Sequence, residues 1–249
     1  MVHWILIAAI GAVVGYLGGL FGKGGAAIAT PFLALIGVPA IVAVASPLPA
    51  TVPGTLVAFS RYRKGGFANR RVIGWSVACG VPATVVGALL TRWVAGGTLV
   101  TVTDVVIVCL GLRVLLHRNR TIGAAPDADP DPSSVRLATI AIAVGLLAGL
   151  LANSGGFLLV PLYLAVLSLP IKSALASSLA VASLLAVPGT IVHASLGHID
   201  WRIAIVFGLA SIPLSSLGAR TALAMNAGRL ERIYGAGLVV LGVGLLALG

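Results

Sequence analysis

The chain has 249 residues, of which 59% are hydrophobic and only 9% are charged. Water-soluble globular domains carry about a quarter charged residues, so this composition excludes an ordinary soluble globule and indicates that lipid surrounds most of the chain. The formal net charge of +10 does not indicate a nucleic-acid-binding protein, because the Lys and Arg residues lie in loops between apolar stretches rather than on one soluble face.

Apolar stretches that predict membrane helices follow one another along the chain. They fall near residues 4–21, 26–38, 40–60, 72–91 and 98–116, and then near 137–153, 157–169, 171–196, 201–222 and 233–248. A spanning helix needs about 20 such residues, so all but two are long enough or nearly so. The short stretches, 26–38 and 157–169, either cross with the help of extended residues or re-enter from one side. No Lys or Arg precedes residue 4, so the first stretch is read as a span rather than a signal peptide.

One stretch between the apolar ones has a soluble composition. Residues 117–135 are rich in Pro, Asp and Ser and lack apolar partners, which is typical of a flexible linker. We therefore predict a first repeat over residues 1–116, a flexible cytoplasmic linker over 117–135 and a second repeat over 136–249.

The two halves match at a spacing of 131 residues. The matching pairs include Gly18 and Gly149, Pro39 and Pro170, Ser46 and Ser177, Gly66 and Gly197, Arg71 and Arg202, Pro82 and Pro213, and Gly87 and Gly218. Chance matches in such a chain would be mostly Ala and Leu, so these pairs indicate an internal duplication.

The charges in equivalent loops have opposite bias. The loop that holds Arg61, Arg63, Lys64, Arg70 and Arg71 has a counterpart with only Arg202 and Asp200. In the next loop the second half carries the excess of basic residues. It holds Arg220, Arg229 and Arg232, whereas the equivalent loop of the first half holds Arg92. Cytoplasmic loops carry the excess of Lys and Arg, so equivalent loops are predicted on opposite sides. The predicted fold is an all-α polytopic membrane protein made of two inverted repeats, each with about five transmembrane or half-membrane helices.

Two glycine-rich stretches precede the short apolar segments. They are Gly22-Lys23-Gly24-Gly25 and Asn153-Ser154-Gly155-Gly156. A helix that begins there leaves its first N–H groups without intrahelical partners, and its dipole places partial positive charge at that end. Two such starts related by the repeat predict an anion site. The alternative is that these glycines only allow helices to pack closely.

Four further side chains are candidate ligands of the same anion. A bound anion would compensate the positive charge of Lys23, although a Lys near the membrane–water interface can also extend its amine to water. Ser46, Ser177 and Ser178 begin the next segments, and their hydroxyls either donate to the substrate or bond back to helix carbonyls. No metal-ligand cluster, phosphate-binding loop or catalytic triad occurs, so the sequence predicts no metal, no cofactor and no enzyme.

Doubled motifs in a fixed order resemble the sulfite exporter TauE/SafE family of membrane permeases. A Gly-rich stretch that runs to a Pro occurs at 22–31 and at 155–161, an Ala-x-x-Ser motif occurs at 43–48 and at 174–179, and Gly197-His198-Ile199-Asp200-Trp201 matches the family's Gly-x-Val/Ile-Asp-Trp loop. Lys23, Ala26, Pro47 and Asn153-Ser154 depart from the family's usual residues, for which a changed substrate is one interpretation.

The resemblance implies a multi-pass permease of the bacterial cytoplasmic (inner) membrane that moves sulfite or an organosulfonate, commonly outward. We expect alternating access, with the anion held at the repeat interface by the residues named above. An anion channel that uses the same helix starts as a filter and a membrane subunit without transport are the alternatives. A homodimer and coupling to protons stay open, the latter because sulfite titrates near neutrality.

Overall fold

The computed structural model describes residues 4–22, 26–90, 133–150 and 155–248, and these residues form helices joined by short turns. The helices of the first half are α1 (Trp4–Phe21), α2 (Ala26–Leu35), α3 (Ala40–Ala45), α4 (Leu48–Lys64) and α5 (Arg70–Leu90). Those of the second half are α7 (Ser134–Leu150), α8 (Gly156–Ala165), α9 (Ile171–Ser195), α10 (Trp201–Ala224) and α11 (Ala227–Leu248). The predicted segment 98–116 and most of the linker lie outside the described residues.

The described helices confirm an all-α polytopic membrane protein. Five spans are long and apolar enough to cross a bilayer, namely α1, the combined α3–α4 unit, α5, α9 and α10. The short predicted segments become α2 and α8, with ten residues each. Ten helical residues rise only about 15 Å, so neither helix alone crosses a hydrocarbon core of about 30 Å.

Helices from opposite halves pack against each other in pairs. α1 contacts α10, and α5 contacts α7. A Cβ atom on Gly15 or Gly19 of α1 would overlap the backbone carbonyl of Ser211 or Ser215. Without a hydrophobic force between helices in lipid, small residues that let backbones meet are what hold membrane helices together.

The pairing of α5 with α7 repeats the pairing of α10 with α1 at the level of single residues. A Cβ on Gly145 would overlap the carbonyl of Gly80, and one on Gly149 would overlap the carbonyl of Thr84. Gly80 and Thr84 stand 131 positions before Ser211 and Ser215. Gly145 and Gly149 stand 130 positions after Gly15 and Gly19, so the two interfaces use residues of exchanged halves that are equivalent to within one position.

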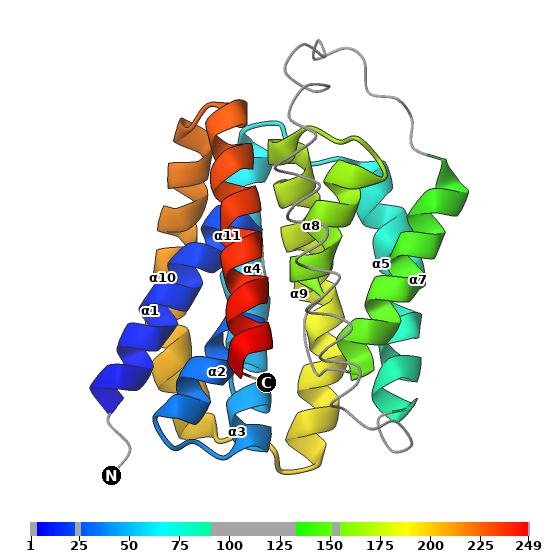
Figure 1. Cartoon of the computed structure of the whole chain (residues 1–249). Helices are drawn as coiled ribbons and strands as arrows, with labels where there is room; N and C mark the ends of the chain where they lie inside the picture. The colour runs from blue at the N-terminus through cyan, green and yellow to red at the C-terminus, as the bar shows by residue number, and fades with distance from the viewer. Residues whose placement is uncertain (1–3, 23–25, 91–132, 151–154, 249) are drawn as a thin grey trace.

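Equivalent helices run in opposite directions. In Figure 1, α1, α4 and α10 rise from the bottom of the view to the top, whereas α7, α9 and α5 descend. Opposite directions are what an inverted repeat requires, and the inversion itself remains a prediction.

One span differs between the halves. α9 is continuous, but its counterpart is divided into α3 and α4 at Ser46 and Pro47. Both residues keep right-handed helical backbone angles, and Pro47 has no N–H with which to continue the hydrogen-bond ladder. The second half has Ser178 at the position of Pro47, so only that half carries a hydroxyl there.

The basic residues of the described helices gather at one end of the bundle. They lie at the α4–α5 and α10–α11 connections and at the starts of α7 and α9, at the top in Figure 1, and Arg202 alone begins a helix at the other end. Arg71 donates to Ser134 (3.1 Å), and Lys172 donates to the carbonyl of Leu223 (2.9 Å). The excess of Lys and Arg predicts that this end faces the cytoplasm.

Gly19→Ala should separate α1 from α10, because the new methyl group has no room against the Ser215 carbonyl. We expect a loss of about 1–3 kcal/mol or more, measured as a lower unfolding temperature in detergent. Gly74→Ala is the control, since a Cβ there meets nothing within 4 Å, and it should stabilise α5 by about 0.5–1 kcal/mol. Equal stability of the two variants would contradict backbone contact at Gly19.

Gly66 and Gly197 provide a matched test of topology. They are 131 residues apart, both have positive φ angles (79° and 71°), and a Cβ on either would contact nothing. With Cys79 and Cys109 replaced by Ala, a membrane-impermeant maleimide added to intact cells should label Gly197→Cys and leave Gly66→Cys unlabelled. Labelling of both from outside would contradict the inverted repeat.

Candidate functional site

The two glycine-rich stretches meet at Ser178 of α9. Gly22 directly follows α1, and Gly156 begins α8. The Ser178 hydroxyl lies 2.9 Å from the Gly22 carbonyl and 3.2 Å from the Gly156 carbonyl, and it donates to this pair. We call Gly22, Gly155, Gly156, Ser177 and Ser178 the glycine junction. Five predicted site residues adjacent in sequence lie outside the described residues: Lys23, Gly24, Gly25, Asn153 and Ser154.

Gly155 sets the start of α8. Its φ of +67° is in the left-handed region, and a Cβ would come within 2.9 Å of Val144 and 3.2 Å of Ala148, so glycine is required both by conformation and by space. The Gly155 carbonyl accepts the N–H groups of Leu158 (3.1 Å) and Leu159 (3.2 Å), and no side chain caps the helix. The preceding N–H groups, from Gly156 and residue 157, have no partner within the helix.

Ser177 is fully buried, and its hydroxyl has no hydrogen-bond partner in the part of the chain that the structure describes. Leaving a buried hydroxyl unpaired costs about 1–3 kcal/mol. Its neighbour Ser178 is equally buried but fully engaged. The junction thus combines a hydroxyl that holds the backbone with one that is free to bind something else.

Ser46 lies elsewhere. Its hydroxyl accepts the backbone N–H of Asp200 (3.0 Å), and Asp200 in turn caps α10 by accepting the N–H groups of Arg202 and Ile203. Asp200 follows the far end of α9, about 25 Å along that helix from Ser178 at 1.5 Å per residue. The structure does not bring Ser46 together with Ser177 and Ser178.

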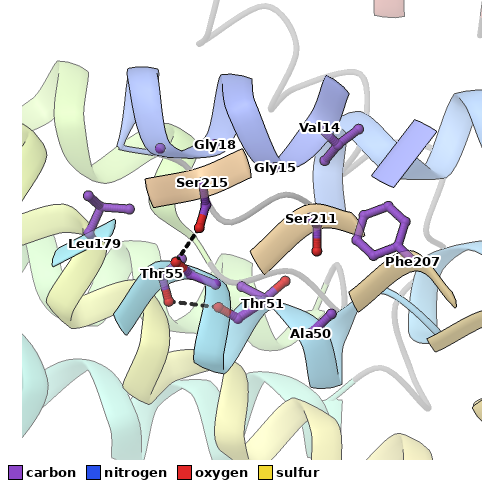
Figure 2. Close-up of a pocket in the computed structure, with 12 residues that line it drawn as sticks. Val14, Gly15, Gly18, Ala50, Thr51, Thr55, Leu179, Phe207, Ser211 and Ser215 are labelled. Atoms are coloured by element: carbon purple, nitrogen blue, oxygen red, sulfur yellow. Dashed lines mark hydrogen bonds between the residues drawn. The ribbon is translucent and has the colours of Figure 1, made fainter. Parts of the chain in front are cut away.

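A polar cavity that the motifs did not predict lies between α1, α4, α9 and α10. Its volume is about 20 Å³, which is room for roughly one water molecule. Figure 2 shows four hydroxyl-bearing residues around it, Thr51 and Thr55 of α4 and Ser211 and Ser215 of α10. Each donates to a backbone carbonyl, as in the 2.7 Å bonds from Thr55 to Thr51 and from Ser215 to Gly54. We call this space the hydroxyl cavity.

A leucine takes the place of one cavity-lining glycine at the equivalent interface of α9 with α5. Gly54 lines the cavity, and the residue 131 positions later is the fully buried Leu185. The side chain of Leu185 reaches within 3.2 Å of a Cβ built on Gly80, at the equivalent interface. Ala182 and Ala186 likewise replace Thr51 and Thr55. The hydroxyls of Thr51 and Thr55 at spacing i, i+4, which α9 lacks at the equivalent positions, were the sequence signal for this cavity.

The cavity adjoins the glycine junction. Gly19 and Leu179 line it, and they are three residues before Gly22 and one residue after Ser178. Three residues span about 5 Å of helix. The hydroxyl cavity and the glycine junction are therefore neighbours along both α1 and α9.

Comparison with known proteins assigns the family. Residues 7–245 match the model of the "Sulfite exporter TauE/SafE" family. The chain belongs to this family. A "Probable membrane transporter protein" of Xylella fastidiosa (strain 9a5c) is 28% identical over 244 residues, covering 94% of this chain and 90% of the relative. The "Probable membrane transporter protein YunE" of Bacillus subtilis (strain 168) is 23% identical over 254 residues, covering 90% and 88%. No solved structure matches the chain.

Membership of the TauE/SafE family, together with the apolar helices, makes the protein a multi-pass bacterial membrane transporter. The family is one of transporters rather than enzymes. The predicted resemblance is confirmed, and so is the membrane location.

Replacing the two adjacent serines should have opposite effects on the ligand-free protein. Ser178→Ala leaves the Gly22 and Gly156 carbonyls without their donor and should cost about 1–3 kcal/mol. Ser177→Ala removes an unpaired hydroxyl and should be neutral or stabilising. Thermal unfolding in detergent measures both, and a Ser177→Ala variant as unstable as Ser178→Ala would show that Ser177 has a structural partner.

Proposed function

We propose that this TauE/SafE protein exports a small sulfur-containing oxyanion, sulfite or an organosulfonate, and that the anion binds at the glycine junction. The observation that carries this proposal is the pairing of the Gly22 and Gly156 carbonyls on one Ser178 hydroxyl, next in sequence to Ser177, whose buried hydroxyl has no partner among the described residues. A buried donor without a partner, next to an uncapped helix start, is suited to an anion.

The chemistry of the junction fits an oxyanion in three ways. The first N–H groups of α8 have no intrahelical acceptors, and the helix dipole adds partial positive charge there. Gly155 and Gly156 present no side chain to keep an oxygen atom away. The Ser177 hydroxyl supplies a further donor, and hydrogen bonds to a charged group contribute about 1.5–3 kcal/mol. Lys23, Gly24, Gly25, Asn153 and Ser154, which adjoin the junction in sequence, complete the proposed site.

Alternating access follows from the way the helices are grouped. The pairs α1–α10 and α5–α7 are each joined by direct backbone contact at glycines, so each pair moves as a unit. α4 packs on α10 and α9 packs on α5, while α4 and α9 contact each other between the two groups. Rocking of one group against the other would open the junction first to one side of the membrane and then to the other.

Purified protein in liposomes should take up sulfite with saturable kinetics. Ser177→Ala should raise KM about tenfold or more, since a lost bond to an anion is worth at least one factor of ten. Ser183→Ala is the matched control, because Ser183 is buried on the same helix and donates to the Ala180 carbonyl at 2.7 Å; its KM should change less than about twofold.

Three outcomes would contradict parts of this proposal. No uptake of sulfite, thiosulfate, sulfoacetate or taurine would remove the assigned substrate class. Equal KM values for Ser177→Ala and Ser183→Ala would remove the glycine junction as the binding site. Unitary currents in a planar bilayer would replace the carrier by an anion channel.

A further inference from the structure

Arg61 is a cation within the helix bundle. It lies on α4, is partly buried, and its Nε donates to the Ser216 hydroxyl of α10 at 2.9 Å. The two basic residues that follow on α4, Arg63 and Lys64, are exposed to the surroundings of the bundle. Arg61 is therefore held between helices, unlike its neighbours.

The guanidinium of Arg61 points toward the middle of the bundle. α4 and α10 run in the same direction (Figure 1), and Ser215, next to Ser216, bonds the Gly54 carbonyl. Gly54 is about 10 Å below Arg61 along α4 at 1.5 Å per residue, so the Ser216 hydroxyl lies well below the Arg61 backbone. Helical side chains lean toward the N-terminus of their helix, which for α4 is the direction of the hydroxyl cavity.

No described acidic residue compensates this charge. Arg61 forms no ion pair within the described part of the chain. Its single described polar contact uses Nε, which leaves the two terminal nitrogens available. A charged residue inside a membrane bundle is costly and in most cases has a functional partner, and guanidinium binds oxyanions through two parallel hydrogen bonds.

The charge and the hydroxyl cavity both involve the contact of α4 with α10. The residue 131 positions after Arg61 is Val192, and the one 131 positions before Ser216 is Val85. At the equivalent interface of α9 with α5, where Leu185 approaches Gly80, both the cation and its partner are thus replaced by valine. At that interface Arg61, Ser216, Thr51 and Thr55 all have apolar counterparts, whereas the counterpart of Ser215 is the hydroxyl-bearing Thr84.

We propose that Arg61, oriented by Ser216, binds the transported oxyanion on the cytoplasmic side of the hydroxyl cavity, before the anion reaches the glycine junction. This inference rests on the proposed function. In the described conformation the cavity holds about one water, so the anion contacts the terminal nitrogens of Arg61 first and enters when α9 moves away from α4 as the two helix groups rock apart. Arg61 is then a specificity residue that favours oxyanions with two negative charges.

The test compares the KM for sulfite with the KM for the monoanion ethanesulfonate, both at pH 8, where sulfite is mostly a dianion. The protein is placed in liposomes with its cytoplasmic face toward the external solution. Arg61→Gln should raise the sulfite KM about tenfold or more and the ethanesulfonate KM by about threefold. Arg61→Lys keeps the positive charge but loses the two parallel N–H donors of the guanidinium, so it should give an intermediate sulfite KM. Arg63→Gln removes an equal charge two residues away and should leave both values within about twofold.

A purely structural Arg61 would lower the amount of folded protein without changing the ratio of the two KM values. Equal ratios in wild type, Arg61→Lys and Arg61→Gln would therefore overturn the inference, and Arg61→Lys alone decides it if Arg61→Gln fails to fold. Wild-type protein that transports neither anion contradicts the proposed function instead, so the two failures are distinguishable.

Discussion

Direct backbone contact between helices of opposite halves is the constraint on which the rest of the structure depends. In lipid, apolar side chains gain little by leaving the solvent, so α1 is held on α10, and α7 on α5, by glycines that allow the backbones to touch. These contacts fix where α1 and α7 end. The chain that leaves α1 at Gly22 and the chain that enters α8 at Gly156 then meet at Ser178. The glycine junction is a consequence of how the halves exchange helices.

The same scaffold carries different chemistry in its two halves. On α4, Gly54, Thr51 and Thr55 line the hydroxyl cavity, and Arg61 of the same helix bonds Ser216 of α10. At the equivalent positions of α9, Leu185, Ala182, Ala186 and Val192 are apolar. Conversely, Ser178 has its counterpart in Pro47, which has no hydroxyl and divides α3 from α4. A duplicated fold has thus become asymmetric, which in our account gives the anion a path along one half and a binding junction on the other.

Much of this architecture could be predicted from the sequence, because matching residues recur at a constant spacing of 131 and so indicate a duplication. The apolar segments and the short α2 and α8 followed from composition and from the spacing of 131. The prediction grouped Ser46 with Ser177 because they are equivalent. In the predicted inverted arrangement, equivalent residues lie on opposite sides of the midplane. In the structure, Ser46 bonds Asp200 instead.

The hydroxyl cavity and Arg61 could not be found from motifs. The cavity exists because Gly54 lacks a side chain that its counterpart Leu185 has, and because helices more than 150 residues apart in sequence share an interface. In the sequence, Arg61 is one of five basic residues in a predicted loop, and these residues indicate only which side of the membrane the loop faces. Only its bond to Ser216 separates it from Arg63 and Lys64.

The central claim is that the glycine junction holds the anion. Crystals of the protein soaked in selenite, an oxyanion of the same shape as sulfite whose selenium scatters anomalously, test it directly. The account predicts an anomalous peak within hydrogen-bond reach of the Ser177 hydroxyl and the first N–H groups of α8. A peak only at the bundle surface, or a glycine junction that stays empty at saturating selenite, would contradict it.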